Sequence, residues 1–171
     1  MSDSVSKPRA AKAVVGLRPV IAQDREFLLK VYECGREIEL SMVPWDPELK
    51  RSFIEHQFDA QATYYGSEFP SAQHDIIMLS DSGEQVGRLY VDRREEKIAI
   101  LDLAVLSEYR RRGIGSAVVD GLIEEARVSG RTVEVYVETF NPSQNFFISL
   151  GFKVENDEGI NLKFVWNGKK A

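Results

Sequence analysis

Residues 103–116 read LAVLSEYRRRGIGS, an apolar run followed by three arginines and two closely spaced glycines. An apolar, strand-like run ends at Leu106. The three arginines Arg110–Arg112 then lead into Gly113 and Gly115, where a helical pattern begins. The first turn of a helix carries backbone N–H groups without intrahelical partners and a partial positive charge. Glycine lets the backbone approach a bulky ligand, and arginine adds forked donors. The stretch therefore predicts a site for phosphate groups.

Other interpretations of this stretch are less consistent with its surroundings. Taken alone, three arginines are more often a solvated basic turn than a ligand site. The stretch is not a P-loop, because no Gly-Lys-Ser/Thr follows at the right spacing. It is not the dinucleotide fingerprint either, since the third glycine of that motif falls on Val118. The strand before the arginines and the helix after them favour the phosphate site.

Apolar periodicity and turn residues predict the elements on either side of this stretch. The expected elements, in chain order, are a strand at 14–17, helices at 23–32 and 48–65, strands at 75–79, 85–92 and 97–106, a helix at 113–127, a strand at 132–137, a helix that Asn141 caps and Gly151 ends, and a strand at 161–166.

The lengths of the connections predict how the strands pair. Short turns join the three strands between 75 and 106, which is typical of an antiparallel meander. A helix joins the strands at 97–106 and 132–137, so these two should be parallel. We therefore expect a mixed α/β fold, with a central, mostly antiparallel sheet and helices on both faces. We expect a single domain over residues 14–171, preceded by a flexible tail at 1–13.

Composition excludes several classes of function. The 171-residue chain has a net charge of −5, which argues against a general nucleic-acid binder. Cys34 is the only cysteine, so no intrachain disulfide can form. No apolar run approaches the roughly 20 residues that span a bilayer. We expect a cytoplasmic protein with no membrane segment.

Two motifs resemble those of the GNAT N-acetyltransferase superfamily. Residues 103–115 look like its acetyl-CoA signature, Arg/Gln-x-x-Gly-x-Gly/Ala after a strand with an apolar-x-Val ending. Asn141-Pro142-Ser143, followed by Leu150-Gly151-Phe152, resembles its second conserved helix and Gly-Phe ending. The order of the elements also matches over about residues 14–167, and the specific part of the resemblance is 97–152.

The resemblance implies direct transfer of an acetyl group from acetyl-CoA, as co-substrate, to a primary amine, with no metal. The acceptor is then a small-molecule amine or a peptide N-terminus, and a homodimer is left open because many members dimerise. By position, the cofactor-binding residues are Leu103, Ala104, Val105, Arg110, Arg111, Arg112, Gly113, Ile114, Gly115, Ser116, Asn141, Ser143 and Phe147.

The catalytic groups are less determined. Asp102, Glu138 and, less favoured, His74 are candidate general bases, although each could be an ordinary surface residue. The superfamily often has a tyrosine acid four residues before the glycine of Gly-Phe, where this chain has Phe147. The segment after Asn141 is also about one residue short. Tyr136 or Ser149 could replace the missing acid.

The absence of this tyrosine leaves a second function open, an acyl-CoA-binding regulatory or interaction module with little turnover. A third, nucleic-acid binding through the three arginines, is opposed by the net charge and by the lack of another basic cluster. The acceptor pocket should come from the first two helices and their loop, where Glu39 and Trp45 would suit a cationic amine. The alternative for Trp45 and the nearby tyrosines, which the sequence favours, is a place in the core.

Overall fold

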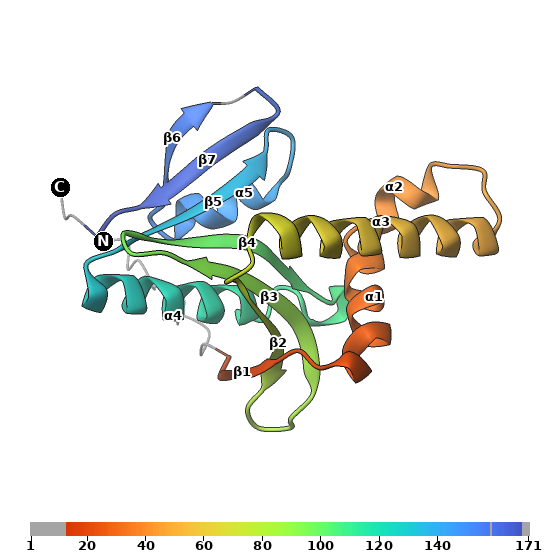
Figure 1. The fold of residues 1–171 in the computed structure, drawn as a ribbon, viewed down its shortest axis with the longest axis horizontal. Helices are drawn as coiled ribbons and strands as arrows, with labels where there is room; N and C mark the ends of the chain where they lie inside the picture. Colours follow the sequence, from red (N-terminus) through yellow and green to blue (C-terminus); the bar gives the residue numbers. More distant parts are fainter. Residues whose placement is uncertain (1–12, 158, 169–171) are drawn as a thin grey trace, which may run out of the picture.

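The computed structural model describes residues 13–157 and 159–168, so the predicted tail lies outside the described residues except for Ala13. One seven-stranded sheet, in the order β1-β2-β3-β4-β5-β7-β6, runs through the molecule (Figure 1). Its strands are β1 (Val15–Pro19), β2 (Gln73–Leu79), β3 (Gln85–Arg93), β4 (Lys97–Val105), β5 (Thr132–Glu138), β6 (Lys153–Asp157) and β7 (Asn161–Trp166).

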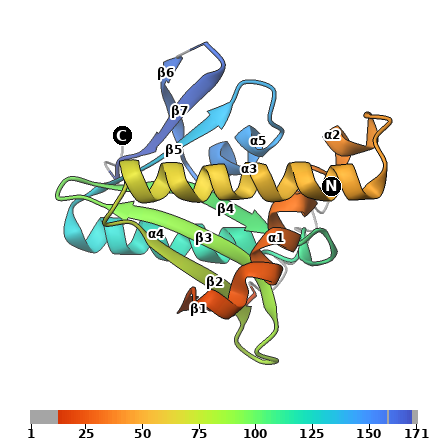
Figure 2. The ribbon, with the colours of Figure 1, turned by 45° about the vertical axis from the view of Figure 1, so that its right-hand side comes forward.

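Helices cover both faces of this sheet. Seen in two orientations, α4 lies against one face of the sheet, while α1 and the long α3 lie on the other (Figures 1 and 2). The helices are α1 (Arg25–Cys34), α2 (Glu37–Ser41), α3 (Pro47–Glu68), α4 (Ile114–Ser129) and α5 (Ser143–Ser149), with 3-10 turns at Ala22–Asp24 and Ser107–Tyr109. None of these helices is long and apolar enough to cross a membrane.

The strand pairing confirms the predicted mixed, mostly antiparallel sheet. β2, β3 and β4 form the antiparallel meander, and β4 and β5 are parallel. The parallel ladder is short, because it joins only residues 97–100 of β4 to residues 132–135 of β5. β7 then pairs antiparallel with both β5 and β6.

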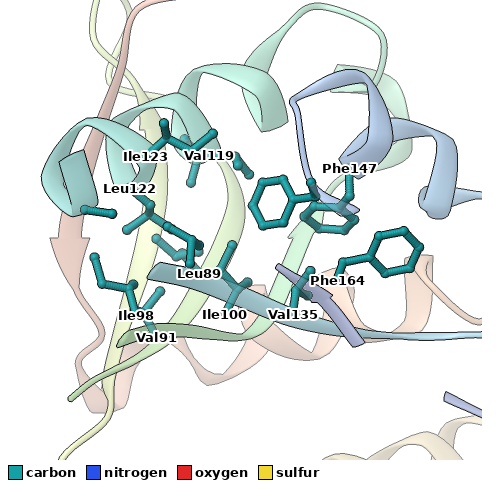
Figure 3. Close-up of a cluster of buried hydrophobic side chains, with 14 of the residues drawn as sticks. Leu89, Val91, Ile98, Ile100, Val119, Leu122, Ile123, Val135, Phe147 and Phe164 are labelled. Atoms are coloured by element: carbon teal, nitrogen blue, oxygen red, sulfur yellow. The ribbon is translucent and has the colours of Figure 1, made fainter. Parts of the chain in front are cut away.

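Two apolar layers hold the helices to the sheet. In the larger one, Val119, Leu122 and Ile123 of α4 pack on the inward side chains of β3, β4 and β5, with Phe147 and Phe164 at one end (Figure 3). The smaller layer packs α1 and α3 on the opposite face. These layers follow the apolar positions that the sequence predicts on each helix.

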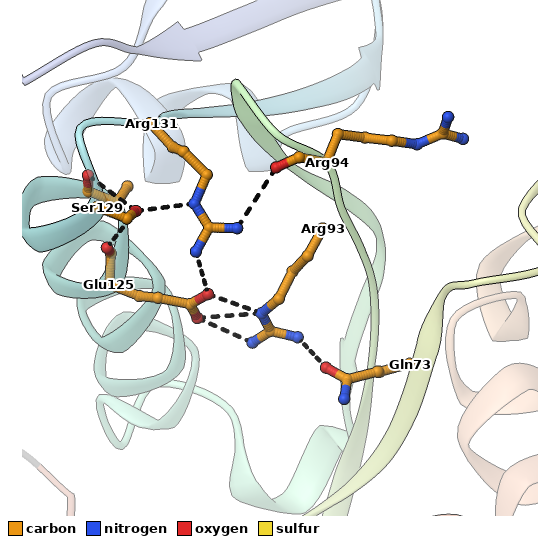
Figure 4. Close-up of polar contacts among 7 residues, drawn as sticks. Gln73, Arg93, Arg94, Glu125, Ser129 and Arg131 are labelled. Carbon is orange, nitrogen blue, oxygen red and sulfur yellow. Dashed lines mark hydrogen bonds and ion pairs between the residues drawn. The ribbon is translucent and has the colours of Figure 1, made fainter.

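An ion-pair network ties the C-terminal half of α4 to the edge of the meander. Glu125 accepts hydrogen bonds from Arg93 Nε at 2.8 Å and from Arg131 Nη2 at 2.8 Å (Figure 4). Arg93 also donates to Gln73 of β2, and Arg131 donates to Ser129 Oγ at 2.8 Å. These contacts hold α4, β2 and β3 together at this end.

Two elements are absent from the sequence prediction. Helix α2 lies in a stretch left unassigned between the first two helices, and β6 follows α5. α2 is one short turn with a single buried residue, Leu40, which gives no periodic pattern. β6 is an edge strand whose side chains at 153–155 are exposed, so it does not need the apolar alternation by which strands are recognised.

Candidate active site

A cleft opens where β4 and β5 separate. Their pairing ends at Ile100 and Val135, although both strands continue, so the rest of each strand lies along a gap. A cavity of about 530 Å³ fills this region. Its walls include residues 100–105 of β4 and residues 135–138 of β5. Backbone groups that would pair in a regular sheet therefore border the cleft.

A β-bulge marks the same point on the other side of β4. Opposite β3, Tyr90 pairs with Asp102 and Val91 with Ile100, so Leu101 is the extra residue. The Tyr65 hydroxyl of α3 donates to the Leu101 carbonyl at 3.0 Å. Burial, and next the nearby charge of Asp102, raise the pKa of Tyr65 to about 12, so this hydroxyl keeps its proton. The helix thus holds the bulge in place.

The arginine-glycine loop turns sharply into α4. Among the described residues, Arg111 is the one non-glycine residue with positive φ, at 61°. Gly113 has φ 77° and lies at the N-cap of α4, where glycine adopts this backbone without strain. A Cβ at Gly115 would come within 3.3 Å of Phe146, so α4 and α5 meet closely here. The first-turn amides of α4 therefore begin beside the cleft that Gly115 lines.

The three arginines of the loop differ in their contacts. Arg110 folds back, and its Nε donates to the Val105 carbonyl at 3.0 Å, while its Nη2 lies 3.7 Å from Cys34 Sγ. The Arg112 guanidinium lies 5.2 Å from the centre of the Tyr109 ring. Arg111 has no side-chain partner among the described residues. Arg110 therefore holds the end of β4, and the other two remain as candidate anion contacts.

The second predicted motif forms the far wall of the cleft. Asn141 Oδ1 accepts a hydrogen bond from the Ser143 amide at 2.9 Å, but α5 begins at Ser143 and its N-cap residue is Pro142, so the predicted cap lies one residue too early. Asn141 and Ser143 both line the cleft. Phe147 also borders it, but its ring is buried and packs on Phe152 and Phe164 at centroid distances of 5.3 and 6.5 Å. No hydroxyl stands at this position.

Of the predicted cofactor-binding residues, some line the cleft directly and the others belong to the loop and helix turn around Gly115. Ile114 is buried in the core, so only its backbone is available to a ligand. The residues that line the cleft are Leu103, Ala104, Val105, Gly115, Asn141, Ser143 and Phe147.

The candidate acids and bases fall into two groups. Tyr136 and Glu138 of β5 and Asp102 of β4 all line the cleft. His74 and Ser149 do not. Burial lowers the pKa of His74 to about 4, with a further contribution from Arg88, and its ring stacks on Tyr90. The Ser149 hydroxyl donates to the Phe146 carbonyl within α5 at 2.6 Å.

At the end of the cleft nearest α1 and α3, several polar residues were missed in the sequence analysis. Arg88 of β3 is only 3% exposed, and its Nε donates to Asp102 Oδ2 at 2.6 Å. Its Nη2 donates to Gln61 Oε1 of α3 at 2.6 Å. Arg88 stands among apolar β3 residues, and a charged residue inside such a strand is the signal that could have identified it.

The predicted acceptor residues divide between the cleft and the surface. Glu39 of α2 lines the cleft, together with Arg36 and Tyr32. Trp45 is not a lining residue. It is 37% exposed and packs edge-on against Phe53, so the alternative of a buried core position is wrong for Trp45, as it is for the exposed Tyr64. No group of three or more His, Cys, Asp or Glu residues within the described ranges could hold a metal ion.

Comparisons with known proteins agree with this geometry. Residues 72–154 match the family model described as the acetyltransferase (GNAT) domain. This segment spans just under half of the chain and contains both the arginine-glycine loop and the stretch from Asn141 to Phe152. The resemblance to the GNAT superfamily inferred from residues 97–152 is therefore confirmed by this match.

Two solved structures share the fold. The PaiA N-acetyltransferase of Thermoplasma acidophilum, in complex with coenzyme A, is 17% identical, with a TM-score of 0.67 over 90% of this chain and 99% of that chain. An acetyltransferase of Thermus thermophilus is 20% identical, with a TM-score of 0.66 over 89% and 96%.

One curated relative is similar in sequence. Mycothiol acetyltransferase of Saccharopolyspora erythraea is 35% identical over 63 residues. The match covers 35% of this chain and only 20% of that protein.

Proposed function

We propose that this protein transfers an acetyl group from acetyl-CoA to a primary amine by direct attack. The observation that carries the proposal is the separation of β4 from β5 beside the N-terminus of α4, where Gly113 is the N-cap residue. The separation leaves an unpaired peptide edge at Leu103–Val105, where the amides of a pantetheine arm can bond. The first-turn amides of α4, with Arg111 and Arg112, suit a diphosphate. The residues present therefore fit coenzyme A.

Proton transfer falls to the groups on the cleft walls. An alkylamine has a pKa of roughly 10, so it must lose a proton before its nitrogen attacks the thioester carbon. Glu138 is the preferred acceptor of that proton, because its carboxylate has no partner among the described residues, whereas Asp102 is held by Arg88. Backbone amides near Val105 stabilise the oxyanion. As the carbon–sulfur bond breaks, Tyr136 supplies a proton to the sulfur in place of the residue at 147.

A second candidate is an acyl-CoA-binding module with little turnover. The observation that favours it is Phe147, whose buried ring replaces the tyrosine acid of the superfamily. Binding and turnover must therefore be measured separately.

The test combines calorimetric binding of coenzyme A with thiol release from acetyl-CoA in the presence of primary amines. Acetylated product, identified by mass, supports the transferase. Tight binding with no release above the rate of hydrolysis on any amine supports the module. Failure to bind coenzyme A at all would contradict both proposals.

A further inference from the structure

Two guanidinium groups line one end of the cleft. The Tyr32 ring of α1 lies 4.7 Å from the Arg36 guanidinium carbon and 5.8 Å from that of Arg88. Arg36 belongs to the turn before α2, and Arg88 to β3, so three elements converge on this ring. Both arginines and Tyr32 line the same cavity as the splayed ends of β4 and β5.

The Arg88 guanidinium has unused donors. It carries five N–H groups, of which one bonds to Asp102 and one to Gln61. Its Nη1 has no hydrogen-bond partner among the described residues, although the side chain is only 4% exposed. Because Arg88 lines the cleft, a ligand there can supply the missing acceptor.

Arg36 is more accessible and only weakly paired. Its side chain is 34% exposed, and its ion pair with Glu39, three residues along the chain, is 3.4 Å long. Partly exposed pairs of this kind contribute little free energy, so an incoming anion can displace Glu39. Arginine also binds carboxylate and phosphate groups through two parallel hydrogen bonds.

The β5 wall of the cleft carries one carboxylate, that of Glu138, and none of its lining residues is a lysine or an arginine. Glu138 is exposed, and its carboxylate has no ion-pair partner within the described residues. Tyr136, on the same face of β5, is 49% exposed. This wall therefore suits an ammonium group, and the arginine end suits an anion.

From this arrangement we infer that the acceptor is a small amine that also carries an anionic group, a carboxylate or a phosphate, bound by Arg36 and Arg88. This inference rests on the proposed transferase activity and narrows its substrate class. The anionic group holds the acceptor at the arginine end of the cleft. The amine then reaches the β5 wall, beside the point where β4 and β5 separate. Asp102 and Glu39 are the acidic groups facing the two arginines, so the anion has to compete with both carboxylates.

Matched acceptors test the inference. Amino acids are compared with their methyl esters, and O-phosphoethanolamine is compared with ethanolamine, by kcat/KM in the thiol-release assay. We expect the anionic member of at least one pair to be preferred by tenfold or more, about the effect of one charge-assisted hydrogen bond. If amino acids are preferred over their methyl esters, the anionic group is a carboxylate. If O-phosphoethanolamine is preferred over ethanolamine, it is a phosphate.

Substitution of Arg36 tests where the anionic group of the acceptor binds. Arg36→Met should raise KM for the preferred anionic acceptor about tenfold, with a smaller change in kcat, and should leave KM for its uncharged partner unchanged. Arg88→Lys keeps a positive charge beside Asp102 but loses the forked donors of the guanidinium group. It should also raise KM for the anionic acceptor. Arg51→Met, which removes a partly exposed arginine from outside the cleft, is the matched control and should change neither KM.

The results separate the two proposals. Equal rates on both members of every pair, or an equal rise in both KM values with Arg36→Met, would overturn the inference while the transferase stands. Absence of turnover on all acceptors, with coenzyme A bound, would overturn the transferase, and the inference with it.

Discussion

Arg110, Arg111 and Arg112 are adjacent in sequence, yet the backbone gives each a different environment. Arg110 bonds to the Val105 carbonyl, Arg112 lies over Tyr109, and Arg111 has positive φ. A non-glycine residue in this region is strained by about 1–3 kcal/mol. The strain falls in the loop that we propose as the diphosphate site. Sequence alone treats the three arginines as equivalent, because only the backbone distinguishes them.

Gly113 tests the proposed diphosphate site. Gly113→Glu should abolish coenzyme A binding in calorimetry, because it puts a like charge beside the diphosphate and a side chain at φ 77°. Gly113→Ala should weaken binding less, since only the backbone strain remains; a Cβ there meets nothing closer than 3.8 Å. Gly83→Ala, with φ 73° in the turn before β3, imposes similar strain away from the cleft and should leave affinity unchanged. Normal binding by Gly113→Glu would show that the diphosphate lies elsewhere.

Tyr136 tests the assignment of the proton donor. Tyr136→Phe should lower kcat at least tenfold, since general acids contribute about 10²–10⁴-fold, and should leave coenzyme A affinity unchanged. Adding Phe147→Tyr should restore part of the rate by returning a hydroxyl to the cleft wall. Tyr64→Phe, at a tyrosine 56% exposed and outside the cleft lining, serves as the control. An unchanged kcat in Tyr136→Phe would mean that the thiolate leaves without this donor.

At the scale of elements, the segment from β1 to α1 depends on one buried carboxylate. Asp24 is 6% exposed and accepts hydrogen bonds from Arg18 at 2.9 and 3.0 Å and from the Ile21 amide at 2.8 Å. The Arg18 bond first, and the Ile21 amide next, lower the pKa of Asp24 from 3.8 to about 2. A lowered carboxylate pKa stabilises the folded state above the unfolded pKa, and this contribution is lost as pH falls from about 4 to 2.

Asp24→Asn should therefore reduce the free energy of unfolding by about 2 kcal/mol at pH 7. The difference between the wild-type and variant proteins should shrink as pH falls from 4 to 2, because protonation removes the same charge. Urea unfolding across this range measures the difference. Asp81→Asn, in the exposed turn between β2 and β3, should change stability little at any pH. A difference that does not depend on pH would assign the effect of Asp24 to packing.

Most elements could be predicted from sequence because their apolar periodicity is strong. The meander, the crossover through α4 and the parallel pair were all expected, and all are present. The glycine turn into α4 and the hydrogen bond of Asn141 to the start of α5 follow from local chemistry, although the N-cap residue of α5 is Pro142. The arginine end of the cleft was not, since Arg88, Gln61 and Tyr32 come from three elements that no local pattern brings together. Tryptophan is highly buried on average, which favours a core position for Trp45, yet its ring packs against Phe53 and stays 37% exposed.

The whole molecule divides at β4 and β5. Four paired residues on each strand join the β1–β4 part of the sheet to the β5–β7 part, and α4 packs on both strands. A ligand in the gap would contact both parts. Because binding to the folded state stabilises it, coenzyme A at 100 times its Kd should add about 2.7 kcal/mol.

This stabilisation should raise Tm by roughly 5–10 °C for a chain of this size. Amide hydrogen exchange should slow most at residues 101–105 of β4 and 136–138 of β5, where these two strands no longer pair with each other. The Gly113→Glu variant should show neither change at the same ligand concentration. Protection confined to β1 and β2 would place the ligand outside the gap.

The bulge at Leu101 has a consequence for length variation in β4. Ile98, Ile100, Leu103 and Val105 pack on the α4 side, whereas Asp102 and Ala104 face α1 and α3. Deleting Leu101 would leave this alternation unbroken from 98 to 105, because the extra residue is what interrupts it. The core could therefore accept the shorter strand. What the deletion would remove is the kink, so a chain lacking residue 101 should fold with β4 and β5 paired beyond Ile100 and Val135 and with the cleft between them closed.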